Sequence, residues 1–338
     1  MSRLPKISLR LHGGMTSTEC VELGKAAEAA GFEGIWFAEN AFGRGILPAA
    51  AACAVATRNI TINAGVFNPF SRHPTMMAME VGALDELSGG RATLSIGSGI
   101  VSATEKLGMD PSKPVPGLRD TLTIVRTLLR GDEIDHAGAT FSARRVKLDY
   151  KPRAGIPIYL AGRGNLTTKL AGELADGLLV SNMVSMAFAA RLAELMQGRR
   201  KVAGRDGSGI VVQYMPCAVS LDSKSAMAAG KRVVGGMLPG FWALGHKIAS
   251  AKEALLAGTG IEEQQFAAVA ARMRAGEDPT DVIDERIARA FALIGPPEEC
   301  LAAASRYAKA GITELALTFA GPSAARQIAI IGEAFKRA

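Results

Sequence analysis

Cysteine and histidine are scarce in this chain of 338 residues, which contains four of each. The cysteines are far apart and lack the spacing of a disulfide framework or a metal site, so each is expected to fill a core. The histidines form no HxxxH pair. The sequence therefore predicts no metal site.

Long apolar runs are also missing. A stretch such as PAAAACAVA (48–56) is far shorter than the roughly 20 residues that a membrane-spanning helix needs. The first residues, MSRLPKISLRLHGG, lack the apolar centre of a signal peptide. We therefore expect a cytoplasmic protein that does not act at a membrane.

The net charge of +7 is not concentrated in one region. Basic residues are dense only in residues 191–205, where the pattern is that of the solvated end of a helix. We therefore expect no nucleic-acid partner. A mildly basic enzyme that takes a polyanionic cofactor or a small anionic substrate accounts for the charge equally well.

The chain does contain a regular alternation of short apolar runs and amphipathic stretches. Eight strands are expected at residues 6–11, 34–39, 59–67, 91–97, 156–162, 176–182, 210–221 and 312–319. Their apolar runs are nearly continuous, as in parallel strands that are buried on both faces. Because a helix is expected after each strand, the pattern predicts an α/β fold, a closed (β/α)₈ TIM barrel; a doubly wound open sheet is the alternative.

Two segments interrupt this alternation. Residues 139–150 are predicted to form a short hairpin before the fifth strand. Residues 222–294 are long, helical in pattern and rich in glycine, and we interpret them as a helical insertion or lid over the barrel mouth. No low-complexity linker is found, so residues 1–338 are expected to form a single domain.

Barrel enzymes place their sites at the carboxyl ends of the strands. Polar and glycine residues follow several predicted strands, namely His12, Glu39, Asn40, Asn68, Gly97, Ser98, Gly99, Gly162, Arg163, Gly164, Asn165, Ser181 and Asn182. The AGRGN stretch (161–165) favours an anion site, because glycines flank an arginine where a helix begins and Asn165 can cap that helix. The IGSG stretch (96–99) is equally compatible with a phosphate or ring contact and with a plain tight turn.

The stretch that ends the third strand, NAGVFNPFSRHP (63–74), also points to the barrel mouth. Pro69 prevents further strand pairing and leaves the Asn68 amide at the mouth. Arg72 and His73 are as compatible with a helix entry and a surface arginine as with a site. No acid–base pair stands out at the strand ends, which favours chemistry carried by a cofactor.

Three longer stretches resemble the luciferase-like superfamily. They are AGVFNPFSRHP (64–74), LDELSGGRATLSIGSG (84–99) and IYLAGRGNLTTKLAGELADGLLVSN (158–182). Within it they look most like the deazaflavin branch and its methylenetetrahydromethanopterin reductase group. The resemblance covers most of the chain and implies a barrel with an insertion that binds coenzyme F420 and transfers hydride. It also implies a homodimer, because many members form one.

The resemblance further implies cofactor-binding residues. The bond between Gly65 and Val66 matches a non-prolyl cis peptide, whose bulge lies behind the deazaflavin ring in the family. Other cofactor contacts are matched by Asn68, Ser98, Gly99, Gly162, Arg163, Gly164, Asn165, Ser181 and Asn182.

On the substrate side the resemblance points to Glu39, Asn40 and His12 as catalytic candidates, with Arg10 beside them. The sequence departs from the family there. Members that act on a sugar phosphate or an alcohol carry histidine in place of Asn40, and the pterin reductases carry acidic residues in place of Arg10 and Ile100. The general acid and base of those members are therefore missing.

Three functions remain open from the sequence. The first is an oxidoreductase that transfers hydride between coenzyme F420 and a small organic substrate, for which a pterin-like one-carbon carrier is a candidate. The second is an FMN-dependent monooxygenase of the luciferase type. The third is a catalytically silent protein that binds a flavin or deazaflavin.

Overall fold

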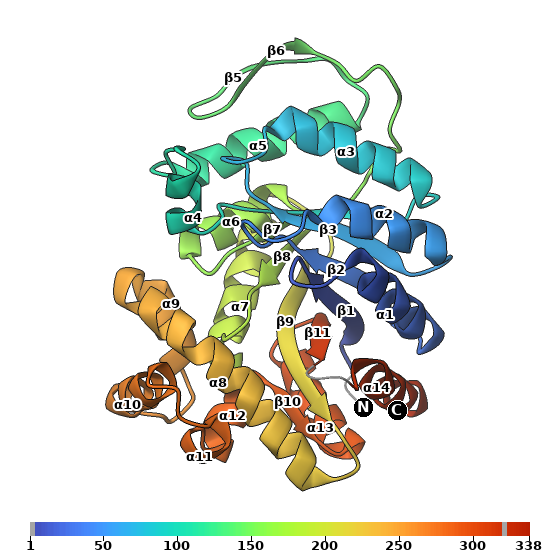
Figure 1. Cartoon of the computed structure of the whole chain (residues 1–338). Helices are drawn as coiled ribbons and strands as arrows, with labels where there is room; N and C mark the ends of the chain where they lie inside the picture. The colour runs from blue at the N-terminus through green and yellow to red at the C-terminus, as the bar shows by residue number, and fades with distance from the viewer. Residues whose placement is uncertain (1–3, 320–322) are drawn as a thin grey trace.

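The computed structural model describes residues 4–319 and 323–338. Eight parallel strands form a closed barrel, because β8 pairs with β9 and completes the ring (Figure 1). In order around the ring they are β1 (Lys6–His12), β2 (Gly34–Ala38), β3 (Thr61–Phe67), β4 (Ala92–Gly97), β7 (Ile158–Ala161), β8 (Gly177–Val180), β9 (Ile210–Val219) and β11 (Glu314–Phe319). The predicted barrel and its eight strands are confirmed.

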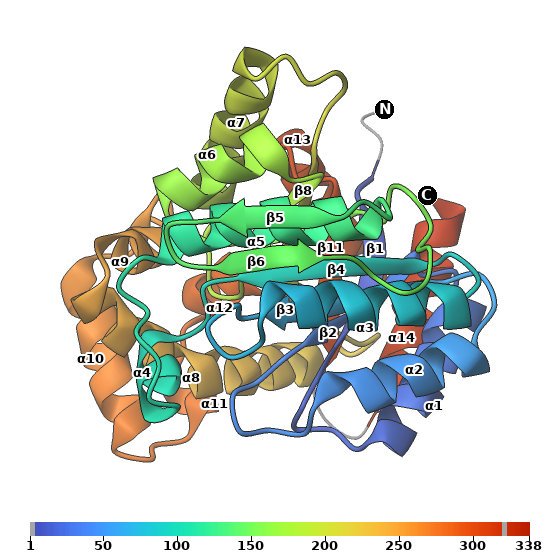
Figure 2. The same cartoon turned by 90° about the horizontal axis from the view of Figure 1, so that it is seen from above.

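Helices surround the barrel (Figure 2). They are α1 (Ser17–Ala29), α2 (Ile46–Ala56), α3 (Pro74–Leu87), α5 (Pro114–Leu129), α6 (Asn165–Leu174), α7 (Met186–Val202), α13 (Pro297–Lys309) and α14 (Ala324–Arg337). Local signals fix their ends: Thr16 and Glu19 form a capping box at α1, and His73 caps α3 just before Pro74. No helix in the described part of the chain is both long and apolar enough to cross a membrane.

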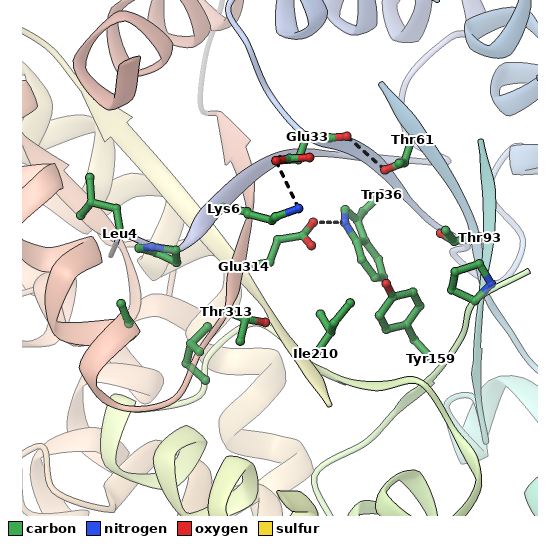
Figure 3. Close-up of a pocket in the computed structure, with 14 residues that line it drawn as sticks. Leu4, Lys6, Glu33, Trp36, Thr61, Thr93, Tyr159, Ile210, Thr313 and Glu314 are labelled. Atoms are coloured by element: carbon green, nitrogen blue, oxygen red, sulfur yellow. Dashed lines mark hydrogen bonds and ion pairs between the residues drawn. The ribbon is translucent and has the colours of Figure 1, made fainter. Parts of the chain in front are cut away.

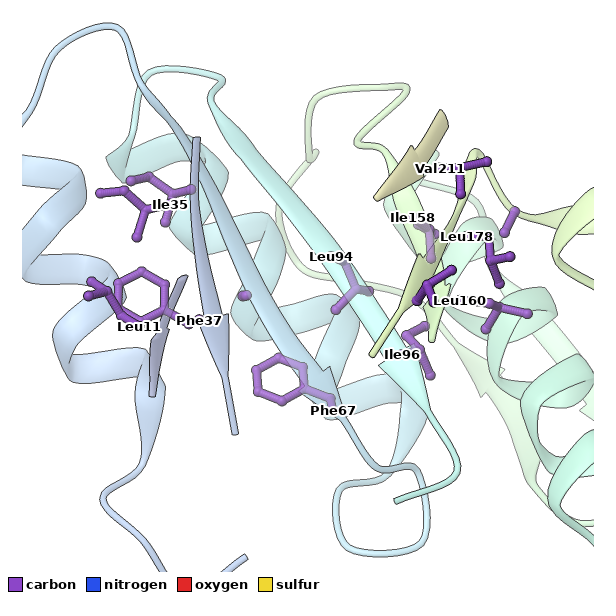
Figure 4. Packing of buried hydrophobic residues seen from close by; sticks show 14 of the residues in the cluster. Leu11, Ile35, Phe37, Phe67, Leu94, Ile96, Ile158, Leu160, Leu178 and Val211 are labelled. Carbon is purple, nitrogen blue, oxygen red and sulfur yellow. The ribbon is translucent and has the colours of Figure 1, made fainter. Parts of the chain in front are cut away.

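Each barrel strand has one face toward the helices and one toward the barrel interior. In β1, Ile7, Leu9 and Leu11 belong to the core between barrel and helices, part of which Figure 4 shows. Ser8 and Arg10 alternate with them and point inward, as the period of two in a strand requires. The inward side of β1 is therefore polar, although both faces of the strand are covered.

Three rings fill the barrel interior and are named here the aromatic layer: Trp36, Tyr159 and Tyr214. The Trp36 ring centroid lies 5.0 Å from that of Tyr159 and 6.4 Å from that of Tyr214, both in edge-on geometry. Leu179 and Val212 pack with them. The layer fills the centre of the barrel and lies between its two ends.

The segment between β9 and β10 (Leu293–Gly295) is helical. It contains α8 (Ser223–Lys247), α9 (Ala249–Leu256), α10 (Glu263–Arg274), α11 (Pro279–Val282) and α12 (Glu285–Phe291). These helices pack around an apolar cluster of their own that includes Trp242, Phe266 and Phe291. The helical pattern expected for residues 222–294 is present up to α12, whereas Leu293 and Ile294 belong to β10. That the segment is an insertion or a lid stays a prediction.

The hairpin before the fifth strand differs from the expectation. It consists of β5 (Ile134–Ala137) and β6 (Ser142–Val146), so the expected start at residue 139 is wrong. The Asp120 carboxylate in α5 accepts hydrogen bonds from the amides of Thr140 and Phe141 and holds this stretch as the turn. Since Asp120 lies far away in the sequence, local patterning could not place the turn.

Candidate active site

The end of β3 is irregular where it reaches the barrel mouth. The Gly65–Val66 peptide bond is cis, which confirms the prediction, and the pairing with β4 shifts register there. Gly65 has φ of 137° and lies so close to the Ser95 carbonyl that a Cβ atom would overlap it. Val66 lies against Gly97 and Ala161, and these three residues form an apolar wall of the mouth.

Asn68 joins the loops that follow β3 and β4. Its Nδ2 donates to Thr104 Oγ1 in the short helix α4 (Val101–Lys106) at 2.9 Å, and its Oδ1 accepts from the Phe70 amide at 3.0 Å. Gly99, with φ of 72°, packs against this side chain, and Ser98 beside it is half-buried. Only part of the hydrogen-bonding capacity of Asn68 is therefore left for a ligand.

Glu39 forms an ion pair with Arg72. From the sequence, Arg72 was equally compatible with a surface position and with a position in the site. Arg72 Nη2 lies 3.3 Å from Glu39 Oε1, Arg72 Nη1 pairs with Glu80, and the guanidinium lies 4.5 Å from the Phe67 ring centroid. Arg72 is thus not a surface residue. Burial raises the pKa of Glu39, and Arg72 opposes that shift. Asn40 is exposed at the rim, where its carbonyl accepts from the Gly43 amide.

His12 ends β1 and is half-buried at the mouth. Its Nδ1 accepts a hydrogen bond from the Gly14 amide at 3.1 Å. Burial lowers the pKa of His12, and the nearby Arg10 cation lowers it further. The ring is therefore neutral at neutral pH with its proton on Nε2, which makes Nε2–H a hydrogen-bond donor at the mouth.

Arg163 follows β7 and is held on two sides. Its Nη2 donates to the main-chain oxygen of Asn182 at 3.0 Å, and its Cζ lies 4.6 Å from the ring centroid of Phe241 in α8. Its Nη1 is buried without a hydrogen bond, and no carboxylate in residues 4–319 and 323–338 pairs with it. Burial lowers the pKa of Arg163 to about 10, so it is a cation at neutral pH.

The segment around Arg163 begins α6. The N-cap is Gly164, and Asn165 is the first helical residue, so the expectation that Asn165 caps α6 is wrong. The turn from β7 places the cap one position earlier, at a residue without a side chain. Ser181 is half-buried, and Asn182 is 7% exposed with an Oδ1 that has no hydrogen bond.

Unpartnered polar atoms gather at this end of the barrel. The buried atoms without a hydrogen bond include Arg10 Nε, Arg163 Nη1, Asn182 Oδ1 and the Tyr214 hydroxyl. Buried polar groups normally find partners, so this gathering fits a site that a polar ligand completes. The cationic Arg163 beside two glycines suits the anionic part of a flavin-type cofactor, and the apolar wall at Val66 suits its ring. No cluster of three potential metal ligands occurs among the described residues.

A cavity of about 460 Å³ opens at the opposite end of the barrel, where the strands begin (Figure 3). Its wall includes Lys6, Glu33, Trp36, Tyr159 and Glu314. Glu314 Oε1 accepts hydrogen bonds from Ser8 Oγ and Trp36 Nε1, both at 2.6 Å. The aromatic layer separates this cavity from the mouth, so it is not part of the candidate active site.

The chain is a (β/α)₈ barrel whose candidate site lies at the carboxyl ends of its strands. The chain belongs to the luciferase-like monooxygenase family, whose sequence pattern matches residues 4–314. The 5,10-methylenetetrahydromethanopterin reductase of Methanolobus tindarius is 27% identical over 314 residues, which are 91% of this chain and 93% of the relative. The enzyme with the same name from Archaeoglobus fulgidus is 28% identical over 317 residues, covering 91% and 92% of the two chains.

The fold has counterparts among solved structures. The coenzyme F420-dependent tetrahydromethanopterin reductase of Methanopyrus kandleri matches with a TM-score of 0.85 and 24% identity, covering 98% of each chain. At this identity the match establishes the fold alone. It includes the part of the chain that forms the helical insertion.

Proposed function

We propose that this protein transfers hydride between coenzyme F420 and a small organic substrate. The observation that carries the proposal is Arg163, a buried cation that lacks an acidic partner among the described residues and stands between Gly162 and Gly164. An uncompensated buried charge is costly, and an anionic cofactor group would compensate it. The similarity to the coenzyme F420-dependent tetrahydromethanopterin reductase of Methanopyrus kandleri supports the choice.

The protein would bind and orient the cofactor, which supplies the hydride chemistry. Val66 and its apolar neighbours would support the ring, while Arg163 and Asn182 would hold the anionic tail. The full proposed set is Gly65, Val66, Asn68, Ser98, Gly99, Gly162, Arg163, Gly164, Asn165, Ser181 and Asn182. Asn68 contributes mainly by fixing the loops, because its amide already bonds Thr104 and Phe70.

His12, Glu39 and Asn40 are proposed to face the substrate. The neutral His12 can donate from Nε2 to a substrate oxygen or nitrogen. Glu39 can hold a proton to a higher pH than an exposed glutamate, because burial raises its pKa. A pterin-like one-carbon carrier is the proposed substrate, on the similarity to the methylenetetrahydromethanopterin reductases.

The test is a fluorescence titration of the purified protein with coenzyme F420 and, separately, with FMN. We expect micromolar or tighter binding of F420, followed by its oxidation or reduction with methylenetetrahydromethanopterin or with a related substrate. Binding of FMN without F420 would overturn the proposal in favour of a flavin monooxygenase. Binding of F420 without turnover across a broad substrate panel would favour a silent binding protein.

A homodimer in the cytoplasm is part of the same proposal. Light scattering on the purified protein should give twice the monomer mass. A monomeric mass at micromolar concentration would contradict the dimer and would leave the cofactor proposal unaffected.

A further inference from the structure

Arg10 is a second arginine of the barrel mouth without an acidic partner in the described part of the chain. Its Nη1 donates to Thr318 Oγ1 at 3.2 Å, and its Nε is buried without a hydrogen bond. Among residues 4–319 and 323–338, Nη1 is the only guanidinium nitrogen of Arg10 with a hydrogen bond of ordinary geometry. The edge between Nε and Nη2, which binds carboxylates side-on, is left without an acceptor.

The groups that surround Arg10 do not neutralise its charge. The guanidinium lies 4.6 Å from the Tyr214 ring centroid. The Tyr214 hydroxyl has no hydrogen bond of ordinary geometry but lies close enough to Arg10 to interact with its charge. Burial raises the pKa of Tyr214 to about 12, so the phenol is neutral at neutral pH. His12 is neutral as well and presents Nε2–H. Arg10 is thus a partly buried cation among neutral groups, of which His12 is also a donor.

Arg10 and Arg163 stand on opposite sides of the barrel. Arg10 is in β1 and Arg163 follows β7, and these two strands are four places apart in the ring of eight. One anionic group placed against Arg163 therefore leaves Arg10 without a counter-charge. The mouth has two separate places for negative charge, and the proposed cofactor accounts for one of them.

We propose that Arg10 binds an oxyanion of the substrate, in the first place a carboxylate, with His12 Nε2–H as a second donor. The inference rests on the proposed function, since it names the substrate class of that site. The Nε–Nη2 edge is buried and has no acceptor of ordinary geometry, and a carboxylate matches it in a bidentate geometry. A phosphate group shares this chemistry and is the second source to be distinguished.

The test uses three small probes that each carry a methyl group: acetate, methylphosphonate and the neutral acetamide. Saturation-transfer NMR at constant ionic strength measures their binding to the wild-type protein and to Arg10→Met, Arg10→Lys and Arg191→Met. Arg191 is the matched control, because it also lies over an aromatic ring, Phe188, but pairs with Glu253 at the outside of the barrel. Thermal melts confirm that each variant is folded, and an F420 titration of each variant is run in parallel.

We expect acetate to bind the wild type and Arg191→Met, and its affinity to fall at least tenfold in Arg10→Met and less in Arg10→Lys. Acetamide should not bind. Stronger binding of methylphosphonate than of acetate would assign the site to a phosphate group.

Equal acetate binding by Arg10→Met and wild type would overturn the proposal. An equally large loss of F420 affinity in Arg10→Met would also overturn it, because it would assign Arg10 to the cofactor. If Arg10→Met does not fold, Arg10→Lys decides: wild-type acetate affinity there contradicts the bidentate contact. Failure of F420 binding in the wild type would overturn the proposed function alone, because acetate binding is measured without the cofactor.

Discussion

Arg163 and Phe241 contact each other across the boundary between the barrel and the helical insertion, with the arginine Cζ 4.6 Å from the ring centroid. Arg163 follows a barrel strand, whereas Phe241 lies in α8. Contacts of this type contribute about 0.5–2 kcal/mol, depending on how far the cation is desolvated. The insertion therefore covers one face of the cation that we propose for the cofactor.

Replacing Arg163 by alanine should weaken F420 binding by roughly 10- to 100-fold, the scale of a charge-assisted hydrogen bond. The difference between variant and wild type should shrink as salt rises, because added ions screen the contact. Fluorescence titrations at low and high salt measure both effects, with Arg191→Ala as the control. Unchanged affinity of Arg163→Ala would show that this arginine is only structural.

The substitution Gly65→Ala should destabilise the fold by at least about 2 kcal/mol, because an alanine is strained at a φ of 137°. Its Cβ would also overlap the Ser95 carbonyl and hydroxyl. Urea denaturation measures the free energy of unfolding. Gly236→Ala in α8, where nothing lies within 4 Å of the new Cβ, is the control and should stabilise by about 0.5–1 kcal/mol. Equal stability of Gly65→Ala and wild type would contradict the described backbone.

Glu314 should make stability depend on pH. Burial raises its pKa in the folded protein, so the folded state holds this proton to a higher pH than the unfolded chain does. Stability is therefore lost as pH rises through the window between the unfolded and the folded pKa. Glu314→Gln keeps an acceptor for Ser8 and Trp36 but cannot ionise.

In thermal melts, the Glu314→Gln protein should melt higher than the wild type at neutral pH. The advantage should vanish below about pH 4, near the ordinary pKa of glutamate. Glu333→Gln, at the exposed ion pair with Arg337, is the control and should change the melting temperature little at any pH. A wild type that is the more stable of the two at pH 7 would show that the ionised Glu314 is better compensated than its contacts indicate.

The substitution Arg72→Met should raise the pKa of Glu39, because burial then acts without the opposing arginine. Glutamate carboxyl NMR signals followed against pH give this pKa directly, independent of any assay of activity. Arg119→Met, whose partner Glu173 lies between outer helices, is the control and should leave Glu39 unchanged. An unaltered titration of Glu39 in Arg72→Met would mean that the pair contributes nothing to its protonation.

The strands and outer helices could be predicted because their signals are local. Apolar runs, the capping box at Thr16 and the proline that opens α3 each specify an element within a few residues. The rule that barrel sites lie at the carboxyl ends of strands then placed His12 and Arg163 at one mouth. Topology alone was enough for that step.

Residues whose position depends on distant partners could not be predicted. Arg72 finds Glu39 and Glu80 only once β2, β3 and α3 are assembled, so the sequence left its role undecided. The amide of Asn68 is used by α4, a short helix without a strong sequence signal. Turn placement in the hairpin likewise depends on Asp120 in another element.

The aromatic layer of Trp36, Tyr159 and Tyr214 makes the barrel a tube that is closed in the middle. The effects of substitutions near Glu314 and near Val66 on the free energy of unfolding should be close to additive, because the aromatic layer lies between the two groups. Selection can therefore change the stability of the fold through residues at the Glu314 end. Ligand binding at the Val66 end is left unchanged.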